Sequence, residues 1–215
     1  MTRTQSRDRP SLPPRFSLLK TFTAADFVTL INAVSGVGSI FSCFEYVRTS
    51  DGRFLWAAIV LVCVAAVADF MDGRVARRSR RFSTLGGDLD SLADLVSFGV
   101  APASLAFAVG MNGGWDWAVL TYFVCCGLSR LARYNATADE LSDESGKVSY
   151  FEGTPIPTSL VLVAVVAVLV GTNRLHADLP LGAVRLGPAM LHPLVALYLL
   201  SGSLMISARL RVPKP

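Results

Sequence analysis

Long stretches without a charged side chain constrain the fold of this chain more than any other feature. Five windows of fifteen residues or more contain no Asp, Glu, Lys or Arg: residues 27–44, 54–68, 95–115, 153–173 and 186–208. A helix that crosses the hydrocarbon core of a bilayer needs about 20 residues, at a rise of about 1.5 Å each. With 52% hydrophobic and 17% charged residues, the chain is also too apolar for an ordinary soluble domain. We therefore predict an integral membrane protein.

These windows, together with residues 117–129 and their flanks, predict an all-α fold of six transmembrane helices. The predicted spans are residues 23–46, 53–72, 92–110, 115–134, 155–172 and 186–207. They form one domain over residues 22–208, between a basic amino-terminal arm with an interfacial stretch (residues 1–21) and a basic tail (residues 209–215). The run behind the arm contains Asp26 and Glu45 and lacks a small-residue cleavage site, so we expect no removable signal peptide.

Lys and Arg are distributed unevenly between the two sides of the predicted membrane. If the amino terminus lies inside, sixteen of the 20 basic residues share its side and four lie opposite. The positive-inside rule then places both termini and the acidic segment 69–94 in the cytoplasm, with the cell membrane as the expected location. The net charge of +4 does not indicate nucleic acid, because the basic residues flank membrane segments. Anionic lipid headgroups and phosphate-bearing substrates are better partners.

The cysteines and histidines do not indicate a site. Cys43, Cys63, Cys125 and Cys126 fall within apolar segments, without the paired spacing of a zinc site or a disulfide framework. His176 and His192 lie far along the chain from the acidic segment. We expect packing or surface roles for all six.

Aspartates gather where the second predicted span ends and the third begins. Asp69 and Asp72 share a helix face at i and i+3, and Asp90 and Asp94 do so at i and i+4. Asp88 points elsewhere, and we expect it to cap a helix or face solvent. Carboxylates brought together cannot all stay ionised without a cation. An oxygen-only set without His or Cys suits Mg²⁺, Mn²⁺ or Ca²⁺ and argues against zinc.

The loop between the two pairs supplies glycines and arginines. Gly73 allows a ligand to approach the backbone, and the pair at 86–87 predicts a tight turn before Asp90. Arginines beside carboxylate-held metals at a membrane surface fit phosphoryl-group chemistry. The alternative is that the acids only pair with these arginines at the interface. Four acids on two neighbouring helix ends favour the metal interpretation.

The stretch DFMDGRVARRSRRFSTLGGDLDSLAD, residues 69–94, resembles the signature of the CDP-alcohol phosphotransferase family, D-x2-D-G-x2-A-R-x8-G-x3-D-x3-D. Its fixed positions are Asp69, Asp72, Gly73, Ala76, Arg77, Gly86, Asp90 and Asp94. The resemblance implies a six-helix membrane fold, usually homodimeric, in which an alcohol displaces CMP from a CDP-linked lipid.

The resemblance also implies roles by position. The implied ligands of a two-metal centre are Asp69, Asp72, Asp90 and Asp94. Asp94 is in addition the implied general base that takes the proton from the attacking hydroxyl. The implied contacts to the CDP moiety are Gly73, Ala76 and Arg77, joined by Asn32 in the stretch TLINAVSG, which resembles the first helix of the family.

Three further stretches resemble the membrane-embedded phosphatidylserine synthase branch of the family: residues 86–103, with a span broken by Gly99 and Pro102, residues 128–136 and residues 150–159. This branch implies the substrates CDP-diacylglycerol and L-serine, and the products phosphatidylserine and CMP. Arg130 and Arg133 share a helix side and are candidates to hold the serine carboxylate or a lipid phosphate. The alternative for both is an interfacial arginine.

Two rival functions remain open at this point. The first keeps the chemistry and changes the acceptor to glycerol 3-phosphate, an inositol phosphate or choline. The second is a membrane cation transporter that uses intramembrane carboxylates, which predicts acids near the middle of the bilayer. The prolines of GTPIP, residues 153–157, fit either a rigid wall for a small substrate or a plain helix start.

Overall fold

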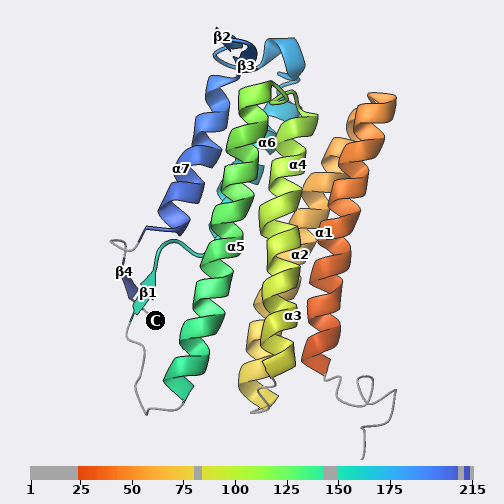
Figure 1. The fold of residues 1–215 in the computed structure, drawn as a ribbon. Coiled ribbons are helices and arrows are strands. Elements are labelled where there is room, and N and C mark those ends of the chain that lie inside the picture. The colour runs from red at the N-terminus through yellow and green to blue at the C-terminus, as the bar shows by residue number, and fades with distance from the viewer. Residues whose placement is uncertain (1–23, 80–83, 143–149, 208–210, 214–215) are drawn as a thin grey trace, which may run out of the picture.

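The computed structural model describes residues 24–79, 84–142, 150–207 and 211–213, with side chains described for residues 26–71, 86–136 and 153–207. The longer helices lie side by side, and the chain passes back and forth along the molecule (Figure 1). The helices are α1 (Ala24–Thr49), α2 (Gly52–Ser79), α3 (Thr84–Asp94), the π-helix η2 (Leu95–Val100), α4 (Ala101–Ala108), α5 (Gly114–Ser142), η3 (Ile156–Ser159), α6 (Leu160–Gly171), η4 (His176–Asp178), η5 (Pro193–Val195) and α7 (Ala196–Met205).

Four short strands accompany the helices. β1 (Tyr150–Glu152) pairs antiparallel with β4 (Arg211–Pro213), and β2 (Val184–Leu186) pairs antiparallel with β3 (Ala189–Leu191). The β2–β3 hairpin lies at the end of the molecule away from α3 (Figure 1). The fold is therefore mostly helical, as predicted, with strands confined to its connections.

Three helical segments are long and apolar enough to cross a membrane: Asp26–Thr49, Gly52–Met71 and Gly86–Ala108. Ile156–Gly171 and Pro193–Met205 are apolar but shorter. Large apolar side chains such as Phe27, Val34 and Phe41 on α1 are exposed, as expected for a surface that faces lipid. The membrane class is supported by three segments, and the number of six spans stays a prediction.

The sixth predicted span began too early. Residues 186–192 were expected to be helical because they carry no formal charge, but residues 184–191 form the β2–β3 hairpin and the helix begins only at Pro193. Gly187 has φ +63, a conformation that glycine adopts at little cost and that ends a helix. Hydropathy therefore gave the wrong element for this segment.

The third predicted span starts earlier than expected and is not broken. It begins at Thr84, and a π turn carries it past Gly99 and Pro102 into α4. Pro102 has no N–H, so an α-helix would leave a carbonyl without its donor. In η2 the Ala101 N–H donates to the Val96 carbonyl, five residues earlier, which is the π pattern. The helix continues, with the turn placed directly after Asp94.

Candidate active site

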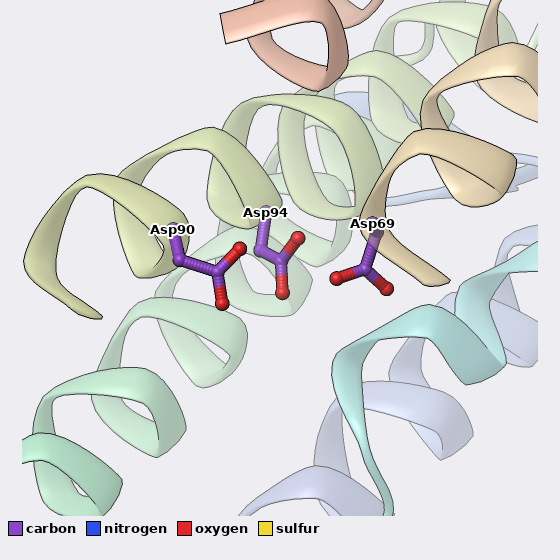
Figure 2. Close-up of side chains that lie close together, drawn as sticks. All are labelled: Asp69, Asp90 and Asp94. Carbon is purple, nitrogen blue, oxygen red and sulfur yellow. The ribbon is translucent and has the colours of Figure 1, made fainter. Parts of the chain in front are cut away.

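Three aspartates from two helices converge near one end of the molecule. Asp69 lies on α2, and Asp90 and Asp94 lie one turn apart on α3 (Figure 2). One carboxylate oxygen from each lies within 4.8 Å of the others. Asp94 is buried, with 8% of its surface exposed, and Asp69 and Asp90 are half-buried. Such a set of hard oxygen donors is able to hold a divalent cation.

The remaining signature residues are only partly described. Asp72, Gly73, Ala76 and Arg77 lie in the backbone of α2, but their side chains are outside the described residues. The fourth metal ligand and the three CDP contacts expected there stay predictions.

The glycine pair at 86–87 does not form the predicted tight turn. Both residues lie inside α3, which begins at Thr84. Asp88 is exposed, as expected, and its Oδ1 accepts a hydrogen bond of 3.2 Å from Asn135 Nδ2. Asn135 Oδ1 in turn accepts one of 3.0 Å from Ser91 Oγ. These bonds tie the start of α3 to α5, a link that the sequence did not suggest.

Asn32 on α1 is fully buried and contacts Asp94 directly. Its Nδ2 donates a hydrogen bond of 3.0 Å to Asp94 Oδ1. The backbone carbonyl of Asn32 accepts a bond of 3.0 Å from Ser97 Oγ, which is also fully buried. The stretch around Asn32 was expected to contact a nucleotide; the structure brings this residue to the carboxylate cluster.

Arg130 on α5 is half-buried and interacts electrostatically with Asp94. Among the described side chains, its buried Nε has no hydrogen-bond partner. Arg133, one turn further along α5, is exposed. The structure therefore brings one cation of the predicted pair into the electrostatic environment of the cluster.

The GTPIP segment lies close to η2, the π turn that follows Asp94. Ile156 is buried, and a Cβ added at Gly127 on α5 would lie 2.9 Å from Ile156 Cδ1 and 3.9 Å from Leu95 Cδ1. Upstream, the Thr154 N–H donates to the Leu204 carbonyl at 3.3 Å. This segment is thus fixed between η2, α5 and the end of α7, next to the residue that follows Asp94.

Both histidines lie away from this site. His176 Nε2 and Tyr46 Oη are 3.0 Å apart, and the two rings are stacked. His192 Nδ1 lies 2.6 Å from Oδ2 of the fully buried Asp116. These contacts join segments at the end of the molecule opposite α3, near the β2–β3 hairpin (Figure 1).

The fold and the site together define a helical protein of membrane type with a carboxylate cluster near one end of its helices. The sequence pattern of the CDP-alcohol phosphatidyltransferase family matches residues 22–202, and the chain belongs to this family. The family predicted from the signature is confirmed.

Relatives share a common name. The chain is 42% identical over 203 residues to the CDP-diacylglycerol–serine O-phosphatidyltransferase of Saccharomyces cerevisiae, covering 93% of this chain and 74% of the yeast protein. It is similar to proteins of the same name from Methanocaldococcus jannaschii, at 31% over 166 residues (76% and 70% of the two chains), and Helicobacter pylori, at 42% over 143 residues (66% and 54%).

Proposed function

We propose that this protein transfers the phosphatidyl group of CDP-diacylglycerol to the hydroxyl of L-serine, giving phosphatidylserine and CMP. The family membership and the names of the relatives support this reaction. The observation that carries it in the structure is the convergence of Asp69, Asp90 and Asp94 within 4.8 Å. These three aspartates are separated positions of the family signature, and the fold brings them together.

The carboxylate cluster fits divalent cations. Its described donors are oxygen atoms only, and carboxylates this close repel one another unless a cation lies among them. We assign the metal site to Asp69, Asp72, Asp90 and Asp94, with two Mg²⁺ or Mn²⁺ ions as cofactors; Ca²⁺ also fits the donor set. When bound, the ions would neutralise charge on the diphosphate oxygens.

The chemical step is a displacement at phosphorus. The serine hydroxyl oxygen attacks the phosphorus that carries diacylglycerol, and a P–O bond forms. The bond from that phosphorus to the bridging diphosphate oxygen breaks, and CMP leaves with the electron pair. Asp94 takes the hydroxyl proton. Its burial keeps water away from the carboxylate that receives the proton.

Substrate contacts follow the family signature and the position of α5. Gly73, Ala76 and Arg77 would hold the CDP moiety. Arg130 and Arg133 would hold the carboxylate of serine or the lipid phosphate, and the interaction of Arg130 with Asp94 supports a place beside the reacting hydroxyl.

We propose six membrane spans with both termini and the site on the cytoplasmic face of the cell membrane, in a homodimer. The start of α1 and the start of α3 lie at the same end of the molecule (Figure 1), consistent with the excess of basic residues on that side. Placement of the acids toward one end also disfavours the transporter alternative, which needs them at the middle of the bilayer.

The decisive experiment offers purified protein CDP-diacylglycerol, Mn²⁺ and one acceptor at a time, and measures CMP release. Serine should support release, whereas glycerol 3-phosphate, inositol phosphate and choline should not. Asp94→Asn is the inactive control. Release with another acceptor but not with serine would keep the family and refute the proposed substrate.

A further inference from the structure

We propose that Asn32 and Ser97 are positioning residues that fix the orientation of the Asp94 carboxylate. This inference deepens the proposed function and rests on it, because it concerns how the proposed base is held. It gives Asn32 a role different from the nucleotide contact expected from the family resemblance. Neither residue belongs to the metal and CDP signature of residues 69–94.

The bond from Asn32 to Asp94 links two helices across a buried space. Nδ2 lies 3.0 Å from Oδ1, the two residues are 62 positions apart, and 0% of Asn32 and 8% of Asp94 is exposed. A carboxylate on a helix rotates about its side-chain bonds unless a partner holds one oxygen. The amide holds Oδ1 and thereby sets the direction of the second oxygen. Asp94 faces Asp69 and Asp90 across the cluster (Figure 2).

Ser97 fixes Asn32 in turn. Its Oγ donates to the Asn32 backbone carbonyl at 3.0 Å. A carbonyl inside an α-helix usually accepts only from an N–H of the same helix, so this is an additional bond between α1 and η2. The approach of the helices is close: a Cβ added at Gly36 would overlap Ser97 Oγ and lie 2.9 Å from Ser97 Cα. Glycine is therefore required at position 36 for α1 to reach this depth.

Ser97 and Asp94, within and directly before the π turn, both contact Asn32 on α1. Asp94 is the last residue of α3, and η2 begins with the next residue. π turns inside helices are often found at functional sites, because they shift side chains relative to the regular helix. Here the Asn32 amide contacts Asp94, directly before the turn, and the Asn32 carbonyl contacts Ser97, within the turn.

A competing role for Asn32 has a structural basis that the experiment must address. Its Oδ1 is buried and accepts no hydrogen bond from the described part of the chain. A donor on the nucleotide is able to use this oxygen. The two roles differ in their kinetics, because a substrate contact changes KM and an orienting contact changes kcat.

The test compares Asn32→Ala and Asn32→Asp in full-length protein. Asn32→Asp keeps the volume of the side chain, replaces the N–H donor and adds a carboxyl group beside Asp94. Both variants should lower kcat about tenfold or more and leave the KM for CDP-diacylglycerol within about twofold of wild type. Electron paramagnetic resonance of substrate-free Asn32→Ala titrated with Mn²⁺ should show about tenfold weaker binding than wild type.

Position 97 supplies a second test. Ser97→Ala, which removes the hydroxyl without adding volume, should reduce kcat in the same way. Ser39→Ala is the matched control: Ser39 is a fully buried serine on α1, and its Oγ has no partner within the described part of the chain. It should behave as wild type.

A raised KM for CDP-diacylglycerol with unchanged kcat and Mn²⁺ binding in Asn32→Ala would overturn the inference and favour the nucleotide contact. Wild-type kinetics in Asn32→Ala or Ser97→Ala would overturn it as well. If wild-type protein released no CMP with serine, the proposed function would fail instead. The Mn²⁺ titration would then still test the inference, because it needs no substrate.

Discussion

Asp116 offers a sharp test of how the end of the molecule opposite α3 is held together. The side chain is fully buried near the start of α5. Its Oδ2 accepts from the Gly113 N–H at 2.8 Å and lies 2.6 Å from His192 Nδ1. Its Oδ1 accepts from the His192 N–H at 2.8 Å. One carboxylate thereby ties the loop before α5 to the segment before η5.

The magnitude of the Asp116→Ala effect follows from these three contacts. The substitution leaves two backbone N–H groups and one imidazole without their acceptor. A buried donor without an acceptor costs about 1–3 kcal/mol, so losing all three contacts should cost roughly 3–5 kcal/mol. For a chain of this length each kcal/mol lowers Tm by about 2–4 °C, so the apparent Tm should fall by roughly 10 °C.

Asp116→Asn should also destabilise the protein. Whichever oxygen becomes the amide nitrogen, one backbone N–H then faces a donor: that of Gly113 in one orientation and that of His192 in the other. The control is Asp178→Ala, an exposed acid on η4 near the same end, which should change stability by no more than about 0.5 kcal/mol.

The assay is thermal unfolding of purified protein in detergent, with CMP release measured below the transition. The activity of folded Asp116→Ala should match wild type, because α3, which carries Asp90 and Asp94, lies toward the other end (Figure 1). A Tm within about 2 °C of wild type would refute the assigned contacts. If Asp116→Ala were stable but inactive, the conclusion that Asp116 has no part in the reaction would be refuted.

Three further predictions concern the site. Removal of divalent cations with EDTA should abolish CMP release and Mn²⁺ should restore it, whereas activity that survives chelation would contradict the metal site. Asp90→Asn should lower kcat about 100-fold or more, while Asp88→Asn, at an exposed position two residues away, should have nearly the wild-type kcat. Similar kcat values for the two variants would show that Asp90 is not part of the site. Arg130→Ala should raise the KM for serine about tenfold, as expected for loss of a hydrogen bond to a charged group. Arg174→Ala, at an exposed position, is the control, and an unchanged KM for serine in Arg130→Ala would exclude the serine contact.

Local spacing was sufficient to predict which aspartates lie close together. Asp90 and Asp94 had to share a helix face because four residues separate them, and Asp69 stands where an apolar span runs into charged residues. The structure brings these three together. The same reasoning failed for the glycine pair at 86–87, because glycine weakens a helix only modestly and the surrounding packing overrides that preference.

The support for Asp94 was beyond sequence reasoning. Asn32 and Ser97 are 65 positions apart, and they meet because Gly36 lets two helices approach closely. No periodicity within either segment encodes that pairing. The hairpin at residues 184–191 was missed for another reason: an uncharged segment reads as a span by hydropathy, although Gly187 and Pro188 indicate a turn.

Asp116 and Asp94, two buried carboxylates toward opposite ends of the molecule, have very different surroundings. Asp116 lies among donors: two backbone N–H groups and an imidazole point at its oxygens. Asp94 has the Asn32 amide on one oxygen and two further carboxylates within 4.8 Å. Donors complete the first arrangement without any ligand. Like charges at short range make the second arrangement costly unless a cation joins it, which is the physical reason for proposing a metal site there.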